Sequence, residues 1–148
     1  MTNIIILFCS ILGGFLVGKH FEKREKCRGQ FFADLTKYLV LLKTNVSVTR
    51  IELAEFDKEF SQSSSVVFAN YLLKREDLSF LTNQQKALVA SLFDSLSATT
   101  SAQLINNLDY YYQLVNAEYS LISNSSRNSF VCVKLGILVG VMVGILLM

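Results

Sequence analysis

The sequence predicts an all-α protein, an antiparallel helical bundle flanked by N-terminal and C-terminal transmembrane helices. Residues 1–18 and 135–148 carry no charged side chain, so every charged residue lies between these two ends. The chain has no proline, and residues 30–135 contain no glycine, which disfavours tight β-turns and glycine-rich phosphate loops in the middle segment. Apolar residues of that segment recur every three or four positions, the period of an amphipathic helix.

The first apolar end predicts an uncleaved membrane anchor over residues 1–18. Its uncharged run from Ile4 to Gly18 gives about 22 Å of helix, against a hydrocarbon core of about 30 Å. Thr2, Asn3 and a snorkelling Lys19 can extend it. A secretory signal peptide is the alternative, but it would carry its basic residues before the apolar run, and here they follow it.

The second apolar end predicts a C-terminal anchor over residues 135–148. Counted from residue 130, the apolar stretch is long enough to span if the charged group of Lys134 reaches the interface along its aliphatic stem. A buried core helix is the alternative. The run from Leu135 to Met148 has no polar face, which argues against a core helix in so small a domain.

Basic residues flank both anchors on the same side. They are Lys19, Lys23, Arg24, Lys26, Arg28 and Lys134. The outer ends of the chain offer no lysine or arginine, so the positive-inside rule places residues 19–134 in the cytoplasm as one helical domain. These side chains are then expected to contact anionic lipid headgroups.

Glycines in the two anchors are spaced four residues apart. Gly14 and Gly18 share one helical face, and Gly136, Gly140 and Gly144 share another. This spacing allows two apolar helices to approach closely, so these glycines are candidate membrane-helix packing residues. Glycine is also common in membrane helices without such a role.

Three capping boxes predict helix starts in the middle segment. They are Thr49 with Glu52, Thr82 with Gln85, and Thr100 with Gln103. Apolar residues at helical spacing then predict the faces of five helices. These are Phe31, Leu35, Tyr38, Leu39, Leu42 and Val46; Leu53, Phe56 and Phe60; Val67, Phe68, Tyr71 and Leu72; Leu88, Val89, Leu92, Phe93 and Leu96; and Leu104, Leu108, Tyr111, Val115 and Ile122.

Residue patterns for catalysis are missing from the sequence. His20 is the sole histidine, and Cys9, Cys27 and Cys132 are too far apart for a zinc or redox motif. We therefore expect no enzyme, no metal, no cofactor, no small-molecule substrate and no nucleic-acid partner. The acidic run from Glu52 to Glu59 predicts a solvated helix face, with a docking surface for a basic partner as the alternative.

Several segments resemble the stage III sporulation protein AB family. The tail, Leu135–Gly140 and Ile145–Met148, is similar to the C-terminal anchor of that family. The exit from the first anchor, at Gly14–Arg24, also resembles it, as do Leu35, Leu39 and Leu42 in the helix that follows. Thr82–Leu96 resembles the penultimate helix, and Gln103, Leu104 and Leu108 resemble the start of the last soluble helix. The chain differs from the family in having no proline.

This resemblance implies a function in endospore formation. The family acts on the mother-cell side of a secretion-like channel complex that joins the mother cell to the engulfed forespore. Its soluble part is similar to the helical domain of type II secretion platform proteins. A non-enzymatic, membrane-anchored scaffold is implied, which contacts other channel-complex proteins, membrane lipid and a cytoplasmic ATPase. A type II secretion or pilus-like platform fragment, or another small membrane interaction protein, is the alternative.

Overall fold

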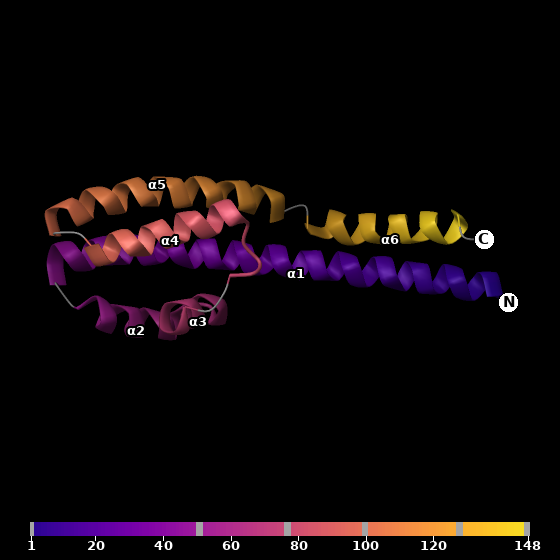
Figure 1. Ribbon diagram of the computed structural model, residues 1–148, viewed down its shortest axis with the longest axis horizontal. Helices are drawn as coiled ribbons and strands as arrows, with labels where there is room; N and C mark the ends of the chain where they lie inside the picture. The colour runs from indigo at the N-terminus through magenta and orange to yellow at the C-terminus, as the bar shows by residue number, and fades with distance from the viewer. Residues whose placement is uncertain (1, 50–51, 76–77, 99–100, 127–128, 147–148) are drawn as a thin grey trace. The chain divides into compact units, whose positions relative to one another are not determined.

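A computed structural model describes residues 2–49, 52–75, 78–98, 101–126 and 129–146 of the chain. These residues form six α-helices and a π-helical turn, and none of them lies in a β-strand. The predicted all-α fold class is therefore confirmed. In order, the elements are α1 (Thr2–Thr44), η1 (Asn45–Thr49), α2 (Leu53–Ser63), α3 (Val66–Lys74), α4 (Asn83–Ala98), α5 (Ser101–Ser126) and α6 (Ser129–Leu146) (Figure 1).

The chain divides into two compact units. Residues 1–26 and 122–148 form one, which we call the helix-pair unit. Residues 27–121 form the other, the bundle unit. Helix α1 contributes to both, because it runs without a break from the first apolar end through the basic residues.

Aromatic side chains fill the core of the bundle unit. Tyr38 lies at its centre and is fully buried. Rings from three other helices surround Tyr38, with centroids 5.3 to 5.9 Å away; they belong to Phe56, Phe60, Phe68 and Phe93. The predicted apolar face of α1 is confirmed at its buried members, which are Phe31, Leu35, Tyr38, Leu39 and Leu42.

Helices α4 and α5 pack against each other in opposite directions. The amide of Gln85 donates to Glu118 Oε2 at 3.0 Å, and the Tyr111 hydroxyl donates to the carbonyl oxygen of Ser91 at 3.1 Å. Rising residue numbers on α4 thus meet falling numbers on α5, as Figure 1 also shows. An ion pair between Lys43 and Asp109 joins α1 to the N-terminal half of α5.

The capping box at Thr82 is confirmed. The backbone N–H of Gln85 donates to Thr82 Oγ1 at 3.3 Å, and the backbone N–H of Thr82 donates to Gln85 Oε1 at 3.2 Å. The Thr82 carbonyl also accepts the first helical hydrogen bond, from Lys86 N at 2.9 Å. Two backbone donors at the start of α4 are thereby satisfied.

Removing this cap should weaken the bundle measurably. We expect Thr82→Ala to lower the free energy of unfolding by about 1 kcal/mol, because an orphan N–H loses its acceptor. Thr82→Ser keeps the acceptor oxygen and should retain most of the stability. Urea unfolding checks both variants, with the exposed Gln84→Ala as the control. A loss in Thr82→Ala no larger than in Gln84→Ala would contradict the role of the cap.

The capping box predicted at Thr49 is wrong. Thr49 belongs to the π-helical turn that continues α1, and α2 begins three residues later than expected, at Leu53. Glu52 takes the N-cap position with extended backbone (ψ 140°), and its side chain makes no capping hydrogen bond. Leu53, predicted on the apolar face, is exposed. The third predicted box includes Thr100, which lies outside the described residues.

Candidate helix-packing interface

The helix-pair unit joins α1 to α6 through glycine backbones. A Cβ placed on Gly14 would collide with the carbonyl oxygen of Gly136, and one placed on Gly136 would collide with that of Gly14. Gly18 lies on the same contact, with its Cα 3.3 Å from where a Gly136 Cβ would lie. Helix backbones touch here, and such an approach leaves no room for a side chain.

The contact continues along α6 at Gly140. A Cβ there would lie 2.5 Å from the carbonyl oxygen of Ser10 and 3.2 Å from the Cα of Ile11. Gly144, one turn further along α6, is also buried. The structure thus brings Gly14, Gly18, Gly136 and Gly140 together in one interface. Ser10 and Ile11 belong to it too, although glycine spacing alone could not identify them.

Gly13 differs from its neighbour Gly14. A Cβ on Gly13 would meet no atom within 4 Å. Gly13 instead lines an apolar groove of about 550 Å³ along the helix pair, together with Val17, Phe21, Leu135, Val139 and Val143. Adjacent glycines therefore have different environments, one packed against backbone and one open.

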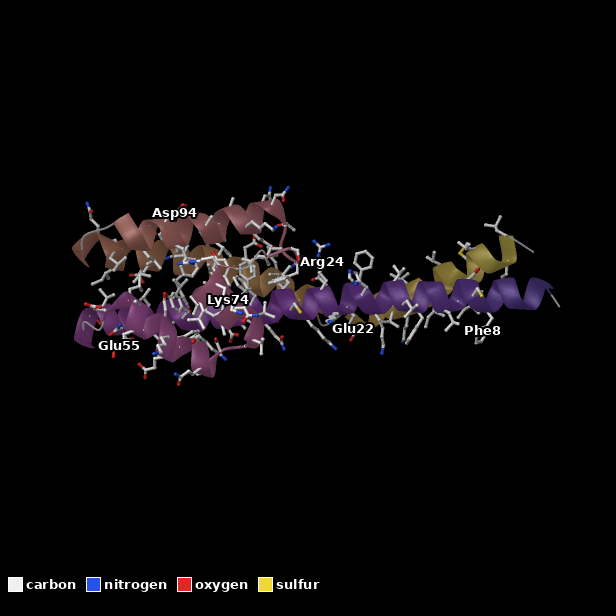
Figure 2. All side chains as sticks on the ribbon, turned by 60° about the horizontal axis from the view of Figure 1, so that its bottom comes forward. Phe8, Glu22, Arg24, Glu55, Lys74 and Asp94 are labelled. Atoms are coloured by element: carbon white, nitrogen blue, oxygen red, sulfur yellow. The ribbon has the colours of Figure 1, made fainter. Side chains whose placement is uncertain are left out.

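Large apolar side chains cover the outside of the helix-pair unit. Phe8 and Leu16 on α1 are about two-thirds exposed, and Leu138 and Ile145 on α6 are more than half exposed. Figure 2 shows the Phe8 side chain projecting away from its helix. Within the described residues, no helix reaches the combination of length and hydropathy needed to cross a membrane.

The predicted membrane-flanking basic residues are mostly exposed. Lys19, Lys23, Arg24, Lys26 and Lys134 are exposed, and Arg28 is half-buried. The ammonium group of Lys19 lies 5.3 Å from the centre of the Phe15 ring, so its stem follows the apolar surface. Lys26 pairs with Glu22 one helical turn earlier, at 2.7 Å.

A partly buried polar pair in the bundle unit was not predicted from the sequence. The Tyr38 hydroxyl donates to Asp57 Oδ1 at 2.6 Å. Burial raises the pKa of the Asp57 carboxyl, while the Tyr38 hydrogen bond and the charge of Arg75 oppose that rise. Burial, and then the bond to Asp57, raise the pKa of the Tyr38 hydroxyl far above its ordinary value. The Tyr38 hydroxyl therefore keeps the proton that it donates in this hydrogen bond.

Arg75 extends this polar pair toward the aromatic core. It ends α3 with left-handed backbone (φ 51°), a conformation uncommon for a residue with a side chain. Its guanidinium lies 4.3 Å from the centre of the Phe93 ring and 5.2 Å from that of Tyr71. These cation–π contacts hold Arg75 near Asp57, where its charge favours the carboxylate.

The acidic run divides between solvent and interior. Glu52, Glu55 and Glu59 are exposed, and Figure 2 shows Glu55 at the outer surface of the bundle unit. Asp57 instead turns inward to Tyr38. The predicted solvated face is confirmed for the three glutamates and is wrong for Asp57, because its hydrogen bond compensates for burial.

Among the residues that the structure describes, no three histidine, cysteine or acidic side chains gather in the way a metal site requires. Compared with known proteins, the chain matches no family model, no curated protein and no solved structure.

Proposed function

We propose that this protein is a non-enzymatic, membrane-anchored scaffold that works through helix-mediated protein contacts. Its two apolar ends insert together as a packed helix pair, and the bundle unit presents surfaces to partners in the cytoplasm. The observation that carries the proposal is the glycine interface between α1 and α6. Close backbone contact through glycine is how helices associate where lipid removes the hydrophobic driving force.

The surface of the helix pair supports insertion. Charge-free stretches of α1 and α6 pack by their glycine faces and turn Phe8, Leu16, Leu138 and Ile145 outward. An exposed apolar surface on this scale is costly in water and suits lipid. The 18 residues of α6 give about 27 Å of helix, slightly less than a typical hydrocarbon core. Local thinning of the bilayer accommodates such a mismatch at modest cost.

Thiol labelling tests both insertion and orientation. Cys27 is a free, half-buried thiol in the bundle unit, and Cys9 is a free, exposed thiol on the helix pair. In variants that keep only Cys27, an impermeant maleimide should label the protein only after the cells are permeabilised. In variants that keep only Cys9, lipid should block labelling until a denaturing detergent is added.

Two outcomes would contradict this arrangement. Labelling of Cys27 in intact cells would place the bundle unit outside the cytoplasm. Labelling of Cys9 in permeabilised cells with intact membranes would show that the helix pair lies in water.

We further propose that the scaffold serves the channel complex between mother cell and forespore, in the mother-cell membrane that faces the forespore. The support is the resemblance of Leu135–Gly140, Ile145–Met148 and Gly14–Arg24 to the stage III sporulation protein AB family. Its partners would be other channel-complex membrane proteins and a cytoplasmic ATPase. A fluorescent fusion should appear only in the mother cell after asymmetric division. Expression during growth would instead favour a general secretion or pilus-like platform.

A further inference from the structure

Two hollows lie between α1 and α2 on the bundle unit. One, of about 290 Å³, is lined by Leu41, Asn45, Phe56, Glu59, Phe60 and other residues. The second, of about 380 Å³, shares Leu41, Phe60 and Ser63 with the first, so the two form one groove. Leu41 is half exposed between them, and Phe60 is almost fully buried. The groove therefore has an apolar floor with an accessible leucine at its centre.

Acidic side chains border one end of this groove. Glu55 and Glu59 are exposed and four residues apart, so they lie on one side of α2, and the exposed Glu52 is at its N-cap. Glu59 itself lines the first hollow. Lys58 is exposed one helical turn after Glu55, and it does not line the first hollow. The first hollow has no basic lining residue among the described side chains, so this end of the groove is negative.

The side chains that line the other end of the groove have no net charge. Asp34 and Lys37 line the second hollow together and have opposite charge. The Asp34 carboxylate already accepts the backbone N–H of Ser65 at 2.9 Å, which fixes the turn between α2 and α3. Charge complementarity thus favours a positive occupant at the Glu59 end only.

From this geometry, we propose that the groove binds a basic amphipathic helix of a partner protein. Aliphatic side chains of the partner enter the hollow over Leu41 and Phe60, and its lysine or arginine side chains face Glu55 and Glu59. This mode combines an apolar anchor with a charged rim, as helix-in-groove interfaces do. The proposal deepens the scaffold function by naming a docking surface, and it does not require that the helix pair span a membrane.

A peptide probe tests this surface. A fluorescent amphipathic peptide of leucine and lysine is titrated into the full-length chain in detergent micelles, with empty micelles as the blank. A leucine–glutamate peptide should not bind, and a serine–lysine peptide of equal charge should bind at least tenfold more weakly. Hydrogen exchange should show protection in α2 and at residues 40–45 when the leucine–lysine peptide binds.

Paired variants distinguish peptide binding in this groove from nonspecific charge attraction to the whole protein. Glu55→Gln with Glu59→Gln should weaken peptide binding about fivefold. Its control, Gln113→Lys with Asn116→Lys on α5, changes the net charge equally and should have a smaller effect. Leu41→Asn should weaken binding about tenfold, whereas Leu121→Asn, another exposed leucine, should not.

Three outcomes would overturn the proposal. Equal loss in the groove and control variants would indicate nonspecific charge attraction. Protection confined to other helices would place the peptide elsewhere. Self-association of the chain that is abolished by Leu41→Asn would identify a second copy as the occupant. Failed insertion in the thiol-labelling experiment would leave peptide binding unaffected, so the two proposals fail separately.

Discussion

Gly14→Leu is expected to separate α1 from α6 in the helix-pair unit. Even the first side-chain atom, the Cβ, would overlap the carbonyl oxygen of Gly136. The Cβ is bonded directly to the backbone of α1 and the oxygen belongs to the backbone of α6, so neither atom can rotate out of the way. The helices must move apart along the whole contact, and contacts around Gly140 are lost with them. Overpacking at a site this rigid should cost about 3 kcal/mol.

Gly13→Leu provides the matched control, one residue away on the same helix. Its Cβ meets nothing within 4 Å, so the added side chain enters the open groove and the helix pair stays closed. Spin labels at the exposed positions Leu12 and Leu138, in a background without native cysteines, report the separation. The distance distribution should stay narrow in Gly13→Leu and broaden in Gly14→Leu. A narrow distribution in both variants would show that the glycine contact does not hold the pair.

Periodicity predicted most of the bundle core, since the burial of a helix face follows directly from apolar spacing. Phe31, Leu35 and Leu39 are buried as their spacing predicts. The four-residue glycine spacing indicated faces capable of close approach. It could not indicate that Gly14 opposes Gly136, because pairing between distant segments depends on how the two helices are aligned.

A capping sequence formed the predicted helix cap only where the backbone before the helix had the required conformation. Thr82 and Thr49 begin equivalent capping sequences, yet only Thr82 caps a helix. A cap residue needs extended backbone just before the helix, and Thr49 is already part of the π-helical turn that extends α1. The left-handed backbone of Arg75 likewise has no signal in the sequence, since glycine or asparagine usually occupies that position.

Tyr38→Ala is expected to be the most destabilising single change in the bundle unit. The ring is fully buried and contacts Phe56, Phe60 and Phe68 from two helices and Phe93 from a third. Removing it leaves a cavity at the centre of the core and an unsatisfied Asp57, a combination that should cost about 3–5 kcal/mol. Urea unfolding measures the loss. The exposed Tyr110→Ala is the control, and a similar loss there would contradict the central role of Tyr38.

Tyr38→Phe isolates the hydroxyl, and its effect should depend on pH. Burial raises the folded-state pKa of Asp57 above its unfolded value of about 3.9. The folded chain therefore binds this proton more tightly than the unfolded chain, so protonation of Asp57 stabilises the folded state. This contribution to the free energy of unfolding is complete below the unfolded pKa and is lost as the pH rises through the folded pKa. Tyr38→Phe removes a hydrogen bond that favours the carboxylate. It should cost about 1–2 kcal/mol at pH 7 and less at pH 4, because protonation of Asp57 increases as the pH falls.

Asp57→Asn separates the charge from the hydrogen bond. Its amide oxygen can still accept from the Tyr38 hydroxyl, but the side chain no longer loses hydration as an ion. Stability at pH 7 should therefore equal or exceed that of the native chain, and the pH-dependent contribution of this position should disappear. Loss of stability in Asp57→Asn would mean that Arg75 requires the negative charge nearby. An equal cost of Tyr38→Phe at both pH values would show that Asp57 stays ionised throughout.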